Sequence, residues 1–380
     1  MKILQIIPYP PTYLGGSEIF CKNLSINLKK RHNIDNVILT SDIYKRALKT
    51  SIISDSIKVI YKRFYFNLWG INPIVNILNY IKKNYKKFDI IHAHSYIFLT
   101  TLQTSILKKI LKFPLVLHIH GGIQTTPVLE STFSEKVLLF SKRNFFDKII
   151  GKYVIESADT IISVSKTDLI FIENMYKISK KKKIWIPNAV EISKFNYDSK
   201  VKREYITFIG RLSYIKGIDI YLKIITKLHQ LNNKLKFLII GNGPLKYLVD
   251  EAKTKIPITH FTHYPYEKIQ EIYKISKVLL LTSRYEGLPT TILESLASKT
   301  PVIAPKVGGI TEVIINNKTG ILYDLNNYNN VISEIINLLD NPTKLKVLGS
   351  NGLNLVKKRF SWKYVTKEIK KVYEELLNLT

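Results

Sequence analysis

Apolar runs of strand length, each followed by a glycine-containing loop and a helical pattern, constrain this 380-residue chain more than any other feature. The run 277–283, KVLLLTS, lacks a clean alternation of apolar and polar residues, which is typical of a strand buried on both faces. Gly287 and Pro289 interrupt the pattern, and apolar residues then recur at helical spacing in 292–297. This segment is therefore predicted to be a strand, a loop and a helix.

The same order of elements recurs along the chain, so the predicted fold class is α/β in both halves. A chain of this length can bury two full cores. The other strands are predicted at 2–7, 89–94, 114–120, 206–211 and 236–240.

Two glutamates accompany the loop after residue 283. Glu286 lies in the predicted loop, and Glu294 lies one turn into the predicted helix. The free amides at a helix N-terminus favour phosphate, whereas a carboxylate repels it and pairs naturally with hydroxyls of a ribose or a sugar. In the alternative interpretation, Thr291 and Glu294 form a capping box and Glu286 is a solvated loop charge. This segment alone leaves both interpretations open.

Two cations flank the loop that follows the predicted strand 206–211. Arg211 offers a planar fork of donors and Lys216 a point charge, and together they could hold a pyrophosphate and neutralise it as a leaving group. The alternative is two solvated loop charges in a very basic chain. The later stretch 241–244, GNGP, would let a backbone approach a ligand, but it is a weak signal by itself.

Taken in order, these motifs resemble the family 4 retaining glycosyltransferases, which belong to the glycosyl transferases group 1. Their GT-B fold has two Rossmann-like doubly wound parallel-sheet domains that face a central cleft. The motifs are GRL-x3-KG from Gly210, GNGP from Gly241, E-x7-E from Glu286 and GGITEV from Gly308. The resemblance covers nearly the whole chain, and the paired glutamates make it specific. Leu288 begins a Leu-Pro pair where Phe-Gly is commoner.

The resemblance implies metal-independent transfer of a sugar from a nucleotide diphosphate of UDP or GDP type to an acceptor hydroxyl, with retention at the anomeric carbon. Arg211 and Lys216 would stabilise the departing diphosphate, Glu286 would hold sugar hydroxyls, and Glu294 would hold the ribose. No cofactor is implied beyond the donor itself. The implied donor-binding loop consists of Gly287, Leu288, Pro289 and Thr290.

The first half of the chain carries the remaining family positions. Gly15 and Gly16 end a loop between the predicted strand 2–7 and a helix predicted at 18–30. The family brings this loop close to the donor phosphate. His120 ends a predicted strand, where the family places a histidine that contacts the donor sugar and helps to stabilise charge at the reacting carbon.

Three further histidines, His92, His94 and His118, lie near His120 in the predicted sheet. Each i, i+2 pair points to one side of its strand, so the four side chains could form a zinc site. No carboxylate or cysteine joins them in the sequence, and we predict no metal, with structural roles for these three. The chain also contains no Asp-x-Asp pattern, which marks many metal-dependent transferases of a different fold.

The stretch 184–190, IWIPNAV, resembles the family's segment IPNGVD, which crosses between the domains. We therefore predict an N-terminal acceptor-side domain at 1–187 and a nucleotide-sugar-binding domain at 188–360. The residues 361–380 are predicted to form a helix that crosses back to the first domain.

The net charge of the chain indicates which kinds of partner it can attract. Lysine and arginine total 58 against 29 acidic residues, a net charge of +29, which attracts nucleic acid or anionic lipid. Basic stretches rich in aromatic and aliphatic residues, at 80–88, 106–113 and 142–153, favour contact with an anionic membrane surface. No nucleic-acid reading module is evident, so we expect no specific nucleic-acid partner.

Localisation follows from three observations. The chain has one cysteine, no signal-peptide pattern and no apolar run approaching the roughly 20 residues of a spanning helix. We therefore expect a cytoplasmic protein, peripheral on the inner face of the cytoplasmic membrane, acting on a glycan or lipid-linked acceptor in cell-surface polysaccharide or glycolipid biosynthesis. Two alternatives are a GT-B nucleotide-sugar epimerase and a basic polyanion-binding protein without transferase activity.

Overall fold

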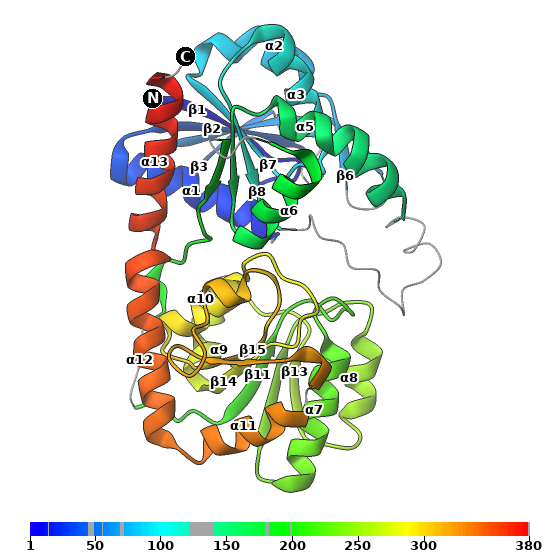
Figure 1. Cartoon of the computed structure of the whole chain (residues 1–380), viewed down its shortest axis with the longest axis vertical. Coiled ribbons are helices and arrows are strands. Elements are labelled where there is room, and N and C mark those ends of the chain that lie inside the picture. The colour runs from blue at the N-terminus through cyan, green and yellow to red at the C-terminus, as the bar shows by residue number, and fades with distance from the viewer. Residues whose placement is uncertain are drawn as a thin grey trace. The chain divides into compact units, whose positions relative to one another are not determined.

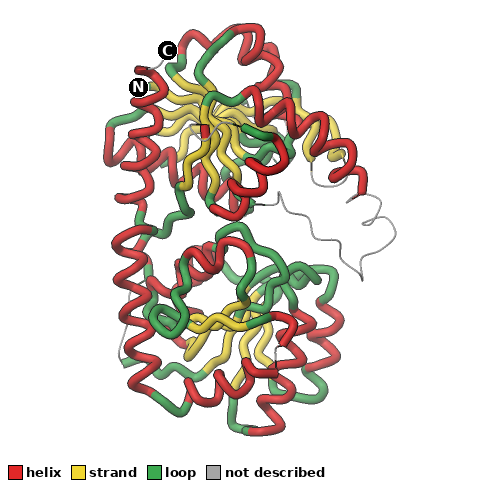
Figure 2. Tube along the Cα trace, in the orientation of Figure 1, coloured by secondary structure: helices red, strands yellow, loops and turns green. Residues whose placement is uncertain are grey.

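The computed structural model describes residues 1–13, 15–44, 49–54, 56–68, 72–121, 140–178, 182–195, 197, 200–327 and 329–378, apart from the side chains of residues 143 and 329. The chain divides into two compact units, Met1–Asn188 with Trp362–Thr380 and Ala189–Ser361. Each unit is an α/β layer structure with a sheet between helices, as the sequence predicts (Figures 1 and 2).

The first unit contains an eight-stranded sheet in the order β10-β9-β8-β7-β1-β2-β4-β3. Its strands pair in parallel, except that β3 pairs antiparallel with β4. A separate antiparallel pair is formed by β5 and β6. The strands are β1 (Lys2–Ile6), β2 (Asp35–Ser41), β3 (Thr50–Ile53), β4 (Ile57–Lys62), β5 (Phe64–Leu68), β6 (Asn72–Val75), β7 (Ile90–His94), β8 (Leu115–Ile119), β9 (Thr160–Ser163) and β10 (Lys183–Trp185).

The last helix of the chain belongs to this first unit and packs on its first helix. It is amphipathic, since Val365, Ile369, Val372 and Leu376 recur at helical spacing and are buried. The helices of the unit are α1 (Gly16–His32), α2 (Leu78–Asn84), η1 (Tyr85–Lys87), α3 (Leu99–Leu111), the π-helical η2 (Lys142–Gly151), α5 (Lys152–Ser157), α6 (Lys166–Tyr176) and α13 (Trp362–Asn378).

The second unit contains a six-stranded sheet, all of whose recorded pairs are parallel, in the order β13-β12-β11-β14-β15-β16. The chain moves outward from β11 in one direction and then returns to β14 on its other side. The β11–β14 pair is therefore the topological switch point, where ligands bind in open sheets of this kind. The strands are β11 (Tyr205–Ile209), β12 (Lys236–Ile240), β13 (Ile258–Phe261), β14 (Ser276–Leu280), β15 (Val302–Pro305) and β16 (Ile321–Tyr323).

Helices cover both faces of this second sheet (Figure 2). The prediction of a doubly buried strand at 277–283 is confirmed for Val278, Leu279 and Leu280, which are all fully buried, and the strand then gives way to a loop. The helices are η4 (Ile192–Lys194), α7 (Ile218–Leu231), α8 (Lys246–Ala252), η5 (Tyr266–Lys268), α9 (Ile269–Ile275), α10 (Thr290–Ala297), η6 (Gly308–Glu312), η7 (Leu325–Asn327), α11 (Asn329–Leu339) and α12 (Pro342–Arg359).

Candidate functional site

The loops that follow β11 and β14 meet at the switch point of the second unit. β11 and β14 are parallel neighbours, so their carboxyl ends lie at the same edge of the sheet. The close approach depends on Gly217, the N-cap of α7, which has a φ of +67°. A Cβ atom on Gly217 would lie 1.9 Å from the carbonyl oxygen of Thr282. Only glycine combines this backbone conformation with this spacing.

Lys216 and Glu286 face one another across these loops. The Lys216 ammonium donates to the two carboxylate oxygens of Glu286 at 2.7 and 2.8 Å, and the Ser283 hydroxyl donates to Oε1 at 2.7 Å. The Glu286 side chain is 8% exposed and that of Lys216 is 35% exposed. The interpretation of Glu286 as a solvated loop charge is therefore wrong, whereas Lys216 still reaches solvent and can meet a ligand.

A second glycine supports the backbone of Glu286. The amide of Gly309 donates to the Glu286 carbonyl at 3.3 Å. Gly308, at the start of η6, has a φ of +47°, and a Cβ atom there would lie 1.9 Å from the same carbonyl oxygen. The sequence marked the stretch from Gly308 only as part of a family motif, and the structure gives it a role in fixing the Glu286 loop.

Arg284 ties the two loops together, and sequence reasoning missed it. Its guanidinium makes a bidentate ion pair with Asp219, at 2.8 and 2.7 Å, and donates to the Tyr214 carbonyl at 2.7 Å. It also lies over the Tyr214 ring, 3.4 Å from the centroid. The Arg284 amide donates to the Ile215 carbonyl at 2.8 Å. These contacts hold the Lys216 loop against the Glu286 loop.

Glu294 is buried, with 3% of its surface exposed, and both of its oxygens accept hydrogen bonds. Tyr266 donates to Oε1 at 2.9 Å and Tyr273 to Oε2 at 2.8 Å. Burial raises the pKa of Glu294 above its ordinary value, and the two phenol hydrogen bonds oppose this shift. The N-cap of α10 is Pro289, and no side chain caps the helix. The alternative interpretation of Thr291 and Glu294 as a capping box is therefore wrong.

The remaining predicted residues of this half lie in the same loops. Arg211 is exposed, and none of the hydrogen bonds or ion pairs recorded for the described residues involves its side chain. Leu288 and Pro289 have buried side chains, while Gly287 and Thr290 are partly exposed. Pro289 has no amide hydrogen, so the amides expected to meet a phosphate must come from its neighbours.

Gly15 and Gly16 lie at the start of α1 in the first unit, with Gly15 as its N-cap. A Cβ atom on Gly15 would lie 2.2 Å from Oε2 of Glu18, whereas one on Gly16 would meet open space. Glu18 is buried in the first helical turn and accepts from the Ser17 hydroxyl at 2.9 Å. Burial raises the pKa of Glu18 above its ordinary value. Sequence reasoning gave Glu18 no role.

His120 follows β8 and belongs to a stack of imidazole rings. Its Nε2 lies 2.9 Å from Nδ1 of His94, whose Nε2 lies 2.9 Å from Oε1 of Gln5. The ring centroids of His118 and His120 are 4.4 Å apart with an interplanar angle of 13°. Burial lowers the pKa of His120 to about 3, so the ring is neutral at ordinary pH. Its Nδ1 has no hydrogen-bond partner among the described residues.

Comparison with known proteins gives the family of this chain. The model of the glycosyl transferases group 1 matches residues 190–355, and the model of glycosyltransferase family 4 matches residues 14–194. The chain is a group 1 glycosyltransferase. A relative described as an uncharacterized glycosyltransferase of Methanocaldococcus jannaschii is 29% identical, over 99% of each chain. The capsular polysaccharide biosynthesis glycosyltransferase CapM of Staphylococcus aureus is 22% identical, over 59% of this chain and 66% of its own.

Solved structures confirm the fold of this group 1 glycosyltransferase. Sucrose-phosphate synthase from Thermosynechococcus elongatus has a TM-score of 0.82 at 18% identity, and the alignment covers 100% of both chains. HepE of Anabaena, solved with UDP and glucose, has a TM-score of 0.75 at 16% identity, with 98% and 99% covered. The predicted GT-B fold and the predicted enzyme class, a glycosyltransferase, are therefore confirmed.

The histidines of the first unit are the candidate metal ligands of this glycosyltransferase. Within the described ranges, His92, His94 and His118 form one group whose ligand atoms lie within 4.8 Å of one another. Their rings are nearly parallel, with interplanar angles of 6° to 19°. Imidazole lone pairs lie in the ring planes, so parallel rings do not direct them at one ion. The absence of a metal from the reaction stays a prediction.

In the parts of the chain that the structure covers, each helix falls short of the length or the apolar character that a bilayer span requires.

Proposed function

We propose that this glycosyltransferase transfers a sugar from a nucleotide-diphosphate sugar to an acceptor hydroxyl, with retention at the anomeric carbon and without a metal ion. The observation that carries the proposal is the Lys216–Glu286 pair at the switch point of the second unit. Two adjoining loops bring together the Lys216 cation, the Glu286 carboxylate, which can accept from hydroxyls, and the N-terminus of α10.

The leaving diphosphate is assigned to Arg211 and Lys216. As the bond between the anomeric carbon and the diphosphate oxygen breaks, negative charge grows on the diphosphate, and preorganised cations stabilise that charge. The amides of Gly287 and Thr290 lie around the start of α10, where the helix dipole favours an anion. Arg211 is exposed and Lys216 partly so, hence both can reach a bound donor.

The two glutamates are assigned to the neutral parts of the donor. Glu286 is already held by Lys216 and Ser283, so its remaining lone pairs can accept from sugar hydroxyls in a fixed orientation. Glu294 is held by two tyrosines in the same way and would accept from ribose hydroxyls. Neither carboxylate needs to act as a base, because an oxygen of the departing diphosphate takes the proton of the acceptor hydroxyl as the new glycosidic bond forms.

In the first unit, we assign Gly15, Gly16 and His120 to donor binding. Because Gly16 has open space where a side chain would be, the backbone there can approach a phosphate closely. His120 is neutral, so we assign it a hydrogen-bonding role toward the sugar and not that of a cation.

Acceptor and location are inferred from the surface and from relatives. CapM is described as a capsular polysaccharide biosynthesis enzyme, which supports a glycan or lipid-linked acceptor in cell-surface polysaccharide or glycolipid biosynthesis. Ile106 and Ile110 on α3, and Phe145 and Ile149 on η2, are exposed apolar residues in basic segments. Lysine with exposed apolar side chains suits a peripheral position on an anionic membrane, on the cytoplasmic side.

The test is a thermal-shift panel with UDP, GDP, ADP and their common sugar conjugates, without metal and at low and moderate salt. HepE of Anabaena was solved with UDP, which supports a UDP donor as the first candidate. We expect stabilisation selective for one base that survives added salt, of about 2.7 kcal/mol at a ligand concentration near one hundred times the dissociation constant. A shift that salt abolishes would instead support a polyanion-binding protein.

A further inference from the structure

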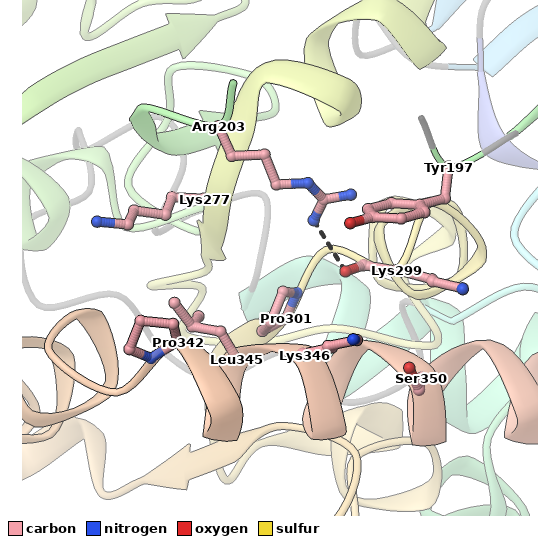
Figure 3. Close-up of a pocket in the computed structure, with 9 residues that line it drawn as sticks. All are labelled: Tyr197, Arg203, Lys277, Lys299, Pro301, Pro342, Leu345, Lys346 and Ser350. Atoms are coloured by element: carbon pink, nitrogen blue, oxygen red, sulfur yellow. Dashed lines mark hydrogen bonds between the residues drawn. The ribbon is translucent and has the colours of Figure 1, made fainter. Parts of the chain in front are cut away.

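A pocket of about 310 Å³ lies in the second unit away from the donor loops (Figure 3). Its walls come from Arg203, which precedes β11, from Lys277 at the start of β14, from the turn before β15, and from one face of α12. These strands are parallel, so their first residues lie at the edge of the sheet opposite to the one that carries Lys216 and Glu286. The pocket is therefore separate from the proposed donor site.

The pocket is strongly basic. Its lining includes the cations Arg203, Lys277, Lys299 and Lys346, and no carboxylate among the described residues. None of the four takes part in a salt bridge recorded for the described part of the chain, whereas lysines elsewhere in the unit do pair with carboxylates, as Lys216 does. In Figure 3 the ammonium groups of Lys299 and Lys346 lie on the side of the pocket where Tyr197 stands.

Arg203 is held by backbone carbonyls and an aromatic ring, and no recorded ion pair of the described residues includes it. Its Nη1 and Nη2 donate to the carbonyls of Lys299 and Ser298 at 2.8 and 2.6 Å, while its Nε is buried without a partner. Burial lowers the pKa of Arg203, and Tyr197, whose ring centroid lies 5.0 Å from the guanidinium carbon, opposes this shift. The ammonium of Lys299 lies 4.8 Å from the same ring. Two cations that have no carboxylate partner among the described residues thus flank one aromatic side chain.

We propose that this pocket binds the phosphate group of a phosphomonoester. A phosphate dianion carries enough charge for several cations and offers acceptor oxygens to lysine ammonium groups and to hydroxyls. The pocket supplies such hydroxyls in Tyr197 and Ser350, and the volume also admits a small organic substituent on the phosphate. A soluble phosphomonoester and the headgroup of phosphatidic acid share this chemistry.

The first arm of the test uses glycerol 3-phosphate in isothermal titration calorimetry at fixed moderate salt, with glycerol as the negative control. The double variant Lys299→Gln with Lys346→Gln should bind it about tenfold more weakly than wild type, since each partly exposed charge contributes modestly. Lys223→Gln removes one exposed charge from α7 outside the pocket, and its binding should match that of wild type. Lys216→Gln, in the donor loops, should also retain binding.

The second arm separates the two sources of the phosphate. Phosphatidylcholine vesicles with and without phosphatidic acid are tested for co-sedimentation with the same variants. Loss of binding in the double variant on phosphatidic acid vesicles alone assigns the site to a lipid headgroup, and loss toward glycerol 3-phosphate assigns it to a soluble ligand. Equal weakening by Lys223→Gln, unchanged binding by the double variant, or the absence of wild-type binding in both arms overturns the proposal.

Discussion

The ammonium group of Lys216 and the carboxylate of Glu286 are joined by two hydrogen bonds, although the residues are 70 positions apart in the sequence. The pair forms because β11 and β14 are parallel neighbours and the loops after them start from the same edge of the sheet. A ligand that engages Lys216 with its phosphate is thereby placed beside the carboxylate that would hold its sugar. In the proposed reaction, the pair would couple the position of the leaving group to that of the transferred group.

Lys216→Gln should lower turnover by about two orders of magnitude, with a much smaller effect on donor affinity. The reason is that leaving-group charge grows toward the transition state, so the lost cation matters most there. Steady-state kinetics and donor titration of the same preparation measure the two effects separately. Lys223→Gln serves as the matched control for the loss of one positive charge. Full turnover in Lys216→Gln would remove Lys216 from the mechanism.

Glu294→Ala and Glu294→Gln should separate a structural from a binding role. Alanine leaves the hydroxyls of Tyr266 and Tyr273 without their acceptor, which should lower the free energy of unfolding by about 3 kcal/mol. Glutamine keeps one acceptor oxygen and should cost less stability. Both variants should bind the donor about tenfold more weakly, since a hydrogen bond to a charged acceptor is lost. Wild-type donor affinity in Glu294→Gln would refute the ribose role while leaving the structural role intact.

The sequence predicted local structure well and side-chain partnerships poorly. The strand at 236–240 follows from its apolar run and from the turn residues after it, and the structure has it at those bounds. The Arg284–Asp219 ion pair joins positions 65 apart, and nothing in the local pattern of either residue indicates the other. The partners of Glu294 are two of 23 tyrosines, selected by how α9 and η5 pack beside α10. Such choices depend on tertiary packing, which one sequence does not display.

The failure of the capping-box interpretation has a specific cause. Thr291 and Glu294 have the required spacing, but Pro289 takes the N-cap position and the helix begins at Thr290. Glu294 therefore lies on the buried face of α10, where tyrosine hydroxyls are available and the N-cap amide is not. The N-cap at Pro289 lies two residues before Thr291, so the helix starts two residues earlier than a capping box of Thr291 and Glu294 requires.

Gly308→Ala should disturb the Glu286 loop, because its φ is positive and its new Cβ atom would overlap the Glu286 carbonyl oxygen. We expect a loss of about 2 kcal/mol in the free energy of unfolding, with reduced turnover in the fraction that stays folded. Chemical denaturation and initial rates provide the measurements. Gly210→Ala is the matched control, since its Cβ would find its nearest neighbour at 3.7 Å. Equal effects from the two substitutions would mean that Gly308 has no special role.

Acid should destabilise the first unit through its stacked histidines. Burial lowers the pKa of His92 to about 3, against 6.5 for an ordinary histidine, and holds the pKa values of His94 and His118 well below that value. As the pH falls below 6.5, these histidines become protonated in the unfolded chain but stay neutral in the folded chain. The free energy of unfolding is therefore highest above pH 6.5 and decreases as the pH falls. Between about pH 7 and about pH 5, His92 alone should lower the free energy of unfolding by about 2 kcal/mol.

The variant His118→Phe isolates this effect from that of the buried carboxylates. Glu18 and Glu294 have raised pKa values, so the stability they confer is present at low pH and is lost as the pH rises through their native pKa values. The two carboxylates make the free energy of unfolding fall with rising pH, whereas the histidines make it rise. The contribution of the carboxylates is the same in wild type and in the variant. Urea denaturation at a series of pH values should therefore show a flatter acid limb for His118→Phe than for wild type. Identical slopes for His118→Phe and wild type would show that His118 is not held neutral by burial.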